Sequence, residues 1–178
     1  HSFVGAMLED SKGNFWVGTE EGGLHWMDRD AGTFIRLLPS SGSLVQLCAP
    51  FLQNEPLTQR KHMVSSFFED QAKRIWIGSG GGGLNVYDLD EKWMRHFEAQ
   101  PGQPGSLPKN VWIKWIFQTF DGAIWIGTRG GVSRFDGGRE FVTLTRESGL
   151  PDSSVRAIEE GLAAGDEARE SGGEQQQR

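Results

Sequence analysis

Three segments of the chain repeat one pattern of apolar and polar positions. Each has a short apolar stretch around Trp-(Val/Ile)-Gly-(Thr/Ser), a Gly-Gly pair a few residues later, and then an aliphatic residue. The tryptophans of the three copies are Trp16, Trp76 and Trp125, which lie 60 and 49 residues apart. This spacing is close to the roughly 40 to 50 residues of one four-stranded propeller blade, so the repeat predicts a propeller architecture.

Aligned on these tryptophans, each copy divides into four short strands. Alternating apolar and polar residues bounded by Asp, Asn and Gly are typical of antiparallel strands joined by tight turns. The expected strands cover residues 4–10, 15–19, 24–28 and 34–38 in the first copy, 64–70, 75–79, 84–88 and 93–97 in the second, and 113–119, 124–128, 132–136 and 141–145 in the third.

The pattern therefore predicts an all-β chain, a partial β-propeller of three four-stranded antiparallel blades. Closed propellers need about four blades or more, so three are expected to form an open arc, as in a fragment of a longer propeller. All seven prolines fall outside the predicted strands, as sheet hydrogen bonding requires. The expected divisions are blades at 1–38, 62–98 and 111–145, connections at 39–61 and 99–110, a connection and lone first strand of an aborted fourth blade at 146–159, and a disordered acidic tail at 160–178.

Composition and charge exclude several classes of partner. The 178 residues carry a formal net charge of −6, and acidic residues accumulate in the last twenty positions. No basic stripe is present to neutralise phosphates, so a nucleic acid partner is not expected. No apolar run is long enough for a membrane span, so this segment is not expected to insert into a membrane. The single cysteine, Cys48, excludes an intrachain disulfide.

The first copy carries a family resemblance. Residues 4–24 read V-G-A-M-L-E-D-S-K-G-N-F-W-V-G-T-E-E-G-G-L, which closely resembles the two-component regulator propeller repeat. The phrases that lead into the first strands, at 105–111 and 149–155, resemble the same repeat. The copies depart from it at Thr119, at Lys73 and in a shortened third Gly-Gly turn, all of which are turn positions. The resemblance extends over residues 3–159.

The resemblance implies a function. In that family, such propellers are extracytoplasmic sensors of bacterial histidine kinases, often hybrid ones, and commonly respond to oligosaccharides or other nutrients. It implies a periplasmic segment that binds a small-molecule or oligosaccharide ligand, within a parent protein that supplies further blades, signalling domains and a possible dimer. No kinase motif lies in this chain, so neither catalytic activity nor a cofactor is expected.

Two alternatives remain open. The Trp-x-Gly-Thr and Gly-Gly-Leu phrases distantly resemble the repeat of quinoprotein-like dehydrogenases, and lyases also use propellers. That class needs metal-binding acids and a catalytic base on the channel, and the sequence does not assemble them. The other alternative is a protein-interaction scaffold.

The repeated residues are interpreted as structural. The tryptophans are expected in the core and the glycines where a neighbouring blade approaches closely; these residues are Trp16, Gly18, Trp76, Gly78, Trp125 and Gly127. The glycines at 80–83 are interpreted as a hairpin turn, since no Lys-Ser/Thr follows them. The histidines have no metal-ligand spacing with one another or with Cys48 and are expected at the surface or on the rim, so no metal site is predicted.

Residues that break the repeat are the candidates for ligand binding. Lys114 replaces Gly5 and Ser65, and Trp115 replaces Ala6 and Ser66. Blade connections and second hairpin turns share one rim of a propeller, where aromatic faces and fixed polar groups suit a sugar or a peptide. Filling of the central channel is the alternative reading. The candidates are Trp112, Lys114, Trp115, Arg129, Asn110, His62, Glu20 and Glu21.

Overall fold

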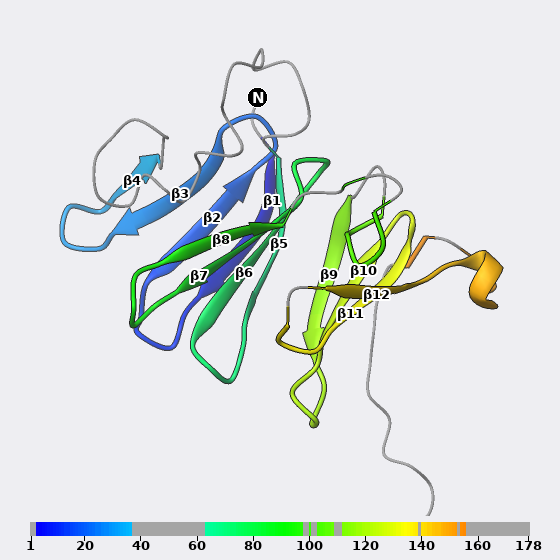
Figure 1. The fold of residues 1–178 in the computed structure, drawn as a ribbon. Helices are drawn as coiled ribbons and strands as arrows, with labels where there is room; N and C mark the ends of the chain where they lie inside the picture. The colour runs from blue at the N-terminus through cyan, green and yellow to red at the C-terminus, as the bar shows by residue number, and fades with distance from the viewer. Residues whose placement is uncertain are drawn as a thin grey trace, which may run out of the picture.

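The structure, a computed structural model, describes residues 3–36, 63–97, 100, 103–108, 112–138, 140–152 and 154–155. These residues form three separate four-stranded antiparallel sheets, each with its strands in chain order (Figure 1). One short 3-10 helix, η3 (Arg146–Ser148), follows the third sheet. The described part of the chain contains no helix with the length and hydropathy of a membrane span. The predicted all-β arrangement of three blades is confirmed.

The strands lie within two residues of their predicted positions. The first blade contains β1 (Val4–Glu9), β2 (Phe15–Thr19), β3 (Gly23–Asp28) and β4 (Thr33–Arg36). The second contains β5 (Val64–Glu69), β6 (Arg74–Ser79), β7 (Leu84–Asp88) and β8 (Met94–Phe97). The third contains β9 (Ile113–Gln118), β10 (Ile124–Thr128), β11 (Gly131–Phe135) and β12 (Phe141–Leu144).

Several sequence predictions lie outside the described residues. They include the connection at 39–61, the acidic tail and all of the predicted lone strand except Val155. The boundaries of the predicted divisions therefore remain predictions.

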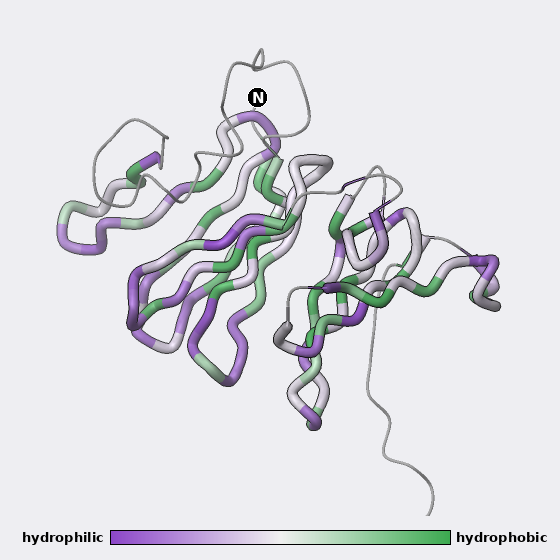
Figure 2. The backbone as a smooth tube through the Cα atoms, in the orientation of Figure 1, coloured by the Kyte–Doolittle hydropathy of each residue, from purple (hydrophilic) through white to green (hydrophobic). Residues whose placement is uncertain are grey.

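The blades contact one another through their first strands. β1 lies against β5, and β5 lies against β9, as expected where first strands surround a common axis. Hydrophobic stretches lie within the strands, where they alternate with hydrophilic ones, and several of the hairpin turns are hydrophilic (Figure 2). Two buried clusters fill the spaces between blades, one around Trp16, Ile75 and Tyr87, the other around Trp76 and Phe135. Each blade is thus stabilised by burying apolar side chains against its neighbour.

The motif glycines provide room for the next blade. A Cβ on Gly127 would lie 3.2 Å from a Val155 methyl carbon, and the contacts at the other two glycines are closer still. In each copy the neighbour is the first residue of the next predicted first strand: Gly18 faces Val64, Gly78 faces Ile113, and Gly127 faces Val155. The predicted close approach of blades at these glycines agrees with this packing, and Val155 occupies the position of a fourth such residue.

The final residue of the motif supports the second hairpin turn. The hydroxyl groups of Ser79 and Thr128 donate hydrogen bonds of 2.8 and 2.9 Å to the carbonyl oxygens of Gly83 and Gly131. Thr19 makes the corresponding bond in the first blade. A hydroxyl at this position satisfies a turn carbonyl inside the sheet, which explains why only Thr and Ser occur there.

Candidate functional site

Trp112 stands at the junction of the second and third blades. It immediately precedes β9 and forms an isolated antiparallel bridge with Gly80, which lies in the β6–β7 turn of the second blade. Arg129 occupies the position of Gly80 in the third blade, directly after β10. The turn of the second blade thus pairs with the Trp112 backbone, and the turn of the third blade places Arg129 beside the Trp112 indole.

Two cations share the indole of Trp112. The guanidinium carbon of Arg129 lies 4.1 Å from the ring centroid, and Nζ of Lys114 lies 5.7 Å from it. Both distances fall within the range of cation–π attraction. Arg129 is exposed, whereas Lys114 and Trp112 are half-buried. We call these three residues the Trp112 cluster.

A β-bulge sets the direction of Lys114. In the pairing of β9 with β10, Ile113 is opposite Thr128 and Trp115 is opposite Gly127, so Lys114 is the extra residue. Gly5 and Ser65 take the same place in the register shifts of the other two blades. Bulges redirect a side chain and are frequent beside functional sites. The sequence alignment identified Lys114 as a substitution but gave no indication of the bulge, because pairing register is a property of two strands.

Neither cation of the cluster has an acidic partner in the described part of the chain. Ion pairs among the described residues join Lys12, Arg29, Lys73, Arg74 and Arg134 to nearby carboxylates. Lys114 and Arg129 take part in none of them. The cluster is therefore a local concentration of positive charge on an acidic protein.

The other predicted residues are placed differently. Trp115 pairs with Gly127 and is 45% exposed, on the face of the third blade that Val155 also contacts through Gly127. Glu20 and Glu21 lie at the β2–β3 turn of the first blade, with the second blade between them and the cluster. Asn110 and His62 lie outside the described residues. Their roles as ligand-binding residues remain predictions.

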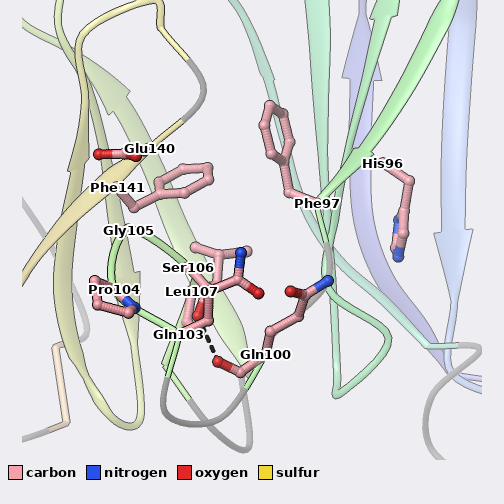
Figure 3. A pocket seen from close by; sticks show the side chains of 10 residues that line it. All are labelled: His96, Phe97, Gln100, Gln103, Pro104, Gly105, Ser106, Leu107, Glu140 and Phe141. Carbon is pink, nitrogen blue, oxygen red and sulfur yellow. Dashed lines mark hydrogen bonds between the residues drawn. The ribbon is translucent and has the colours of Figure 1, made fainter.

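A cavity of about 330 Å³ lies farther from the first strands, between the second and third blades. Phe97 of β8 and Phe141 of β12 contribute aromatic rings, and Gln103 and Ser106 come from the connection between the blades (Figure 3). The Ser106 hydroxyl donates a 2.7 Å hydrogen bond to the Gln100 carbonyl oxygen. Sequence reasoning did not predict the cavity, because its walls come from three segments that only the fold brings together.

The histidines of β3 and β8 are both partly exposed. His25 is half-buried, and its Nδ1 atom is buried without a hydrogen-bond partner among the described residues. Burial lowers the pKa of His25 below 6.5, and the Arg36 charge lowers it further. His96 is half-buried too, with Nδ1 at 2.9 Å from Asn85 Oδ1. Within the described ranges, no three His, Cys, Asp or Glu side chains could share a metal ion.

The fold and the cluster together define a propeller-type repeat protein with a cationic, aromatic junction between blades. The family model described as the two component regulator propeller matches residues 1–21 and 106–130. The second of these segments contains the whole Trp112 cluster. The predicted resemblance to the two-component regulator propeller repeat is thus confirmed, and the chain carries several copies of such a repeat.

Solved structures support the same fold. Two extracellular domains of hybrid two component systems from B. thetaiotaomicron superpose with TM-scores of 0.67 and 0.61, at 21% and 19% identity. They cover 87% and 86% of this chain, which spans only 20% and 18% of theirs. A virginiamycin B lyase from Staphylococcus aureus superposes with a TM-score of 0.52 at 15% identity, over 80% of this chain and 41% of the lyase. At these levels of sequence identity, the similarity to the three structures shows a shared fold alone. No curated protein matches the sequence.

Proposed function

We propose that this chain is a ligand-sensing segment in the extracytoplasmic propeller of a two-component sensor histidine kinase, without catalytic activity of its own. The Trp112 cluster is the observation that carries the proposal. It combines an aromatic face with two cations at a junction between blades, and the match to the regulator propeller repeat includes all three of its residues.

Oligosaccharides are the ligand class that we propose for this site. A sugar ring stacks well on an indole, and polar groups around the ring select its hydroxyl and charged substituents. In this proposal the segment is periplasmic. The remaining blades, the signalling domains and any dimer contact belong to the parent protein.

A site at a blade junction is suited to signalling. Trp112 bridges to Gly80 of one blade and contacts Arg129 of the next. A ligand bound here would touch both blades and would favour the blade arrangement that fits it better. A ligand shifts such an equilibrium only by its difference in affinity for the two arrangements.

Calorimetric titration of the 178-residue chain with a panel of neutral and acidic oligosaccharides tests the proposal. We expect at least one oligosaccharide to bind the wild-type chain and to bind Trp112→Ala at least about tenfold more weakly, since the stacking surface is lost. Trp93→Ala is the matched control, because Trp93 is also a partly exposed tryptophan, 39% exposed, but lies directly before β8 and outside the cluster.

Two results would count against the proposal. If the wild-type chain and Trp112→Ala bind the oligosaccharide equally tightly, the Trp112 cluster is not part of the binding site. Absence of binding by every oligosaccharide in the panel would contradict sugar sensing by this segment.

A further inference from the structure

The repeat provides an internal comparison for the two cations of the Trp112 cluster. Lys114 occupies the bulge position that Gly5 and Ser65 fill in the other blades. Arg129 occupies the turn position of Glu20 and Gly80. The first and second blades form the same bulge, and close their own β2–β3 and β6–β7 turns, without a cation at either position. A positive charge at these positions is therefore not required to build a blade.

The hydrogen-bonding capacity of both side chains is uncommitted within the described residues. Among the described residues, the Lys114 ammonium and the Arg129 guanidinium contact only the Trp112 ring, at 5.7 and 4.1 Å from its centroid. By contrast, the Ser65 hydroxyl at the Lys114 position donates to the carbonyl oxygens of Gly78 in its own blade and Ile113 in the next blade. The cations are positioned by one ring while their N–H donors remain available for a ligand.

We infer that the Trp112 cluster binds an anionic group, a carboxylate or a sulfate, on the ligand of this segment; the inference rests on the proposed function. Arginine presents paired N–H donors that match two oxygen atoms of such a group, and lysine adds a second charge. The indole then contacts the adjacent apolar part of the ligand. The ligand class follows from this chemistry: the site should bind acidic sugars, such as uronates or sulfated sugars, in preference to neutral ones.

Two matched pairs of probes isolate the contribution of the ligand's negative charge to its affinity. One pair is a galacturonic acid trisaccharide and its fully methyl-esterified form, which keeps the sugar and removes the carboxylates. The other pair is a sulfated maltotriose and maltotriose itself, and comparison of the two pairs distinguishes a carboxylate from a sulfate. Calorimetric titrations of the whole chain at low and high salt give the affinity for each probe.

We expect the acidic member of one pair to bind at least about tenfold more tightly than its neutral partner, and the preference to shrink as salt is raised. Arg129→Gln and Lys114→Gln should each reduce the preference, and the double variant should abolish it without weakening the neutral probe. Arg146→Gln is the control, since this exposed cation lies in η3, outside the cluster. The thermal midpoint of each variant establishes that it is folded.

The outcomes separate this inference from the proposed function. If a neutral probe binds as tightly as its acidic partner and Trp112→Ala weakens both, the sensing function stands and the anion preference is overturned. A preference for the acidic probe that persists in the double variant also overturns it, because the charge is then recognised elsewhere. If no probe of either kind binds, the proposed function itself fails.

Discussion

The indole nitrogen of Trp76 donates a 2.7 Å hydrogen bond to Oδ2 of Asp70, and both side chains are almost completely buried. The same bond joins Trp16 to Asp10 at 2.8 Å in the first blade. The carboxylate also accepts hydrogen bonds from the backbone of the turn that follows the first strand. One acidic residue therefore fixes both the turn and the core tryptophan of its blade.

Asp70→Ala should destabilise the chain by about 3 kcal/mol. The substitution leaves the buried indole N–H of Trp76 and the turn amides without an acceptor, and such groups cost about 1 to 3 kcal/mol when unpaired. Thr119→Ala is the matched control, because Thr119 occupies the same place in the third blade but bonds Asp121 and the Ala123 carbonyl rather than an indole. Thr119→Ala should lower the free energy of unfolding by about 1 kcal/mol. Urea unfolding of both variants gives the comparison, and equal losses would contradict a special role for Asp70.

Trp76→Ala should cost about 3 to 5 kcal/mol through the cavity it leaves. Trp76 is 1% exposed and packs edge-on against Phe135 of the third blade, with ring centroids 5.5 Å apart. Trp125→Ala should cost less, because Trp125 is only half-buried. The free energies of unfolding of the two variants, measured in urea, test this order. A larger loss at Trp125 would show that the third blade is the better packed one.

Most of the fold was predictable because the sequence pattern of one blade is repeated three times along the chain. Comparison of the copies separates positions that keep one residue type, such as Gly78, from positions that vary, such as Lys114. Strand alternation and turn residues are local signals, so all twelve strands lie near their predicted positions. Agreement of local pattern with global repeat is what makes this kind of prediction reliable.

The features that the sequence did not predict depend on contacts between segments that are far apart in the sequence. The bulge at Lys114 follows from the register of β9 against β10. The cavity beside Phe97 and Phe141 requires two blades to meet. The burial of His25 likewise follows from packing, since a polar residue at an alternating strand position gives no local sign of which face is covered. The sequence identified Trp112, Lys114 and Arg129 as candidates. Only the structure showed that the two cationic side chains both lie over the Trp112 ring.

Gly78→Ala should destabilise the contact between the second and third blades by about 2 kcal/mol. The new Cβ would lie 2.5 Å from Ile113 Cγ2 and closer still to the Ser66 hydroxyl, and overpacking of this kind typically costs 1 to 3 kcal/mol. Gly138→Ala is the control, since nothing lies within 4 Å of its Cβ position. It should change stability by less than about 0.5 kcal/mol. Chemical denaturation measures both values, and a neutral Gly78→Ala would show that the blades can separate at this point without loss.

Stability should fall as the pH is lowered through the titration of His25. Burial, followed by the Arg36 charge, lowers the pKa of His25 from its ordinary 6.5, so the unfolded chain binds this proton more readily than the folded one. The stabilising contribution of neutral His25 is therefore complete above pH 6.5 and is lost progressively as the pH falls from there toward the folded-state pKa. His25→Gln removes this titration and leaves the other histidines unchanged. Thermal midpoints of the two proteins between pH 8 and pH 5 should therefore show a steeper decline for the wild-type chain, and parallel curves would mean that protonation of His25 is not coupled to folding.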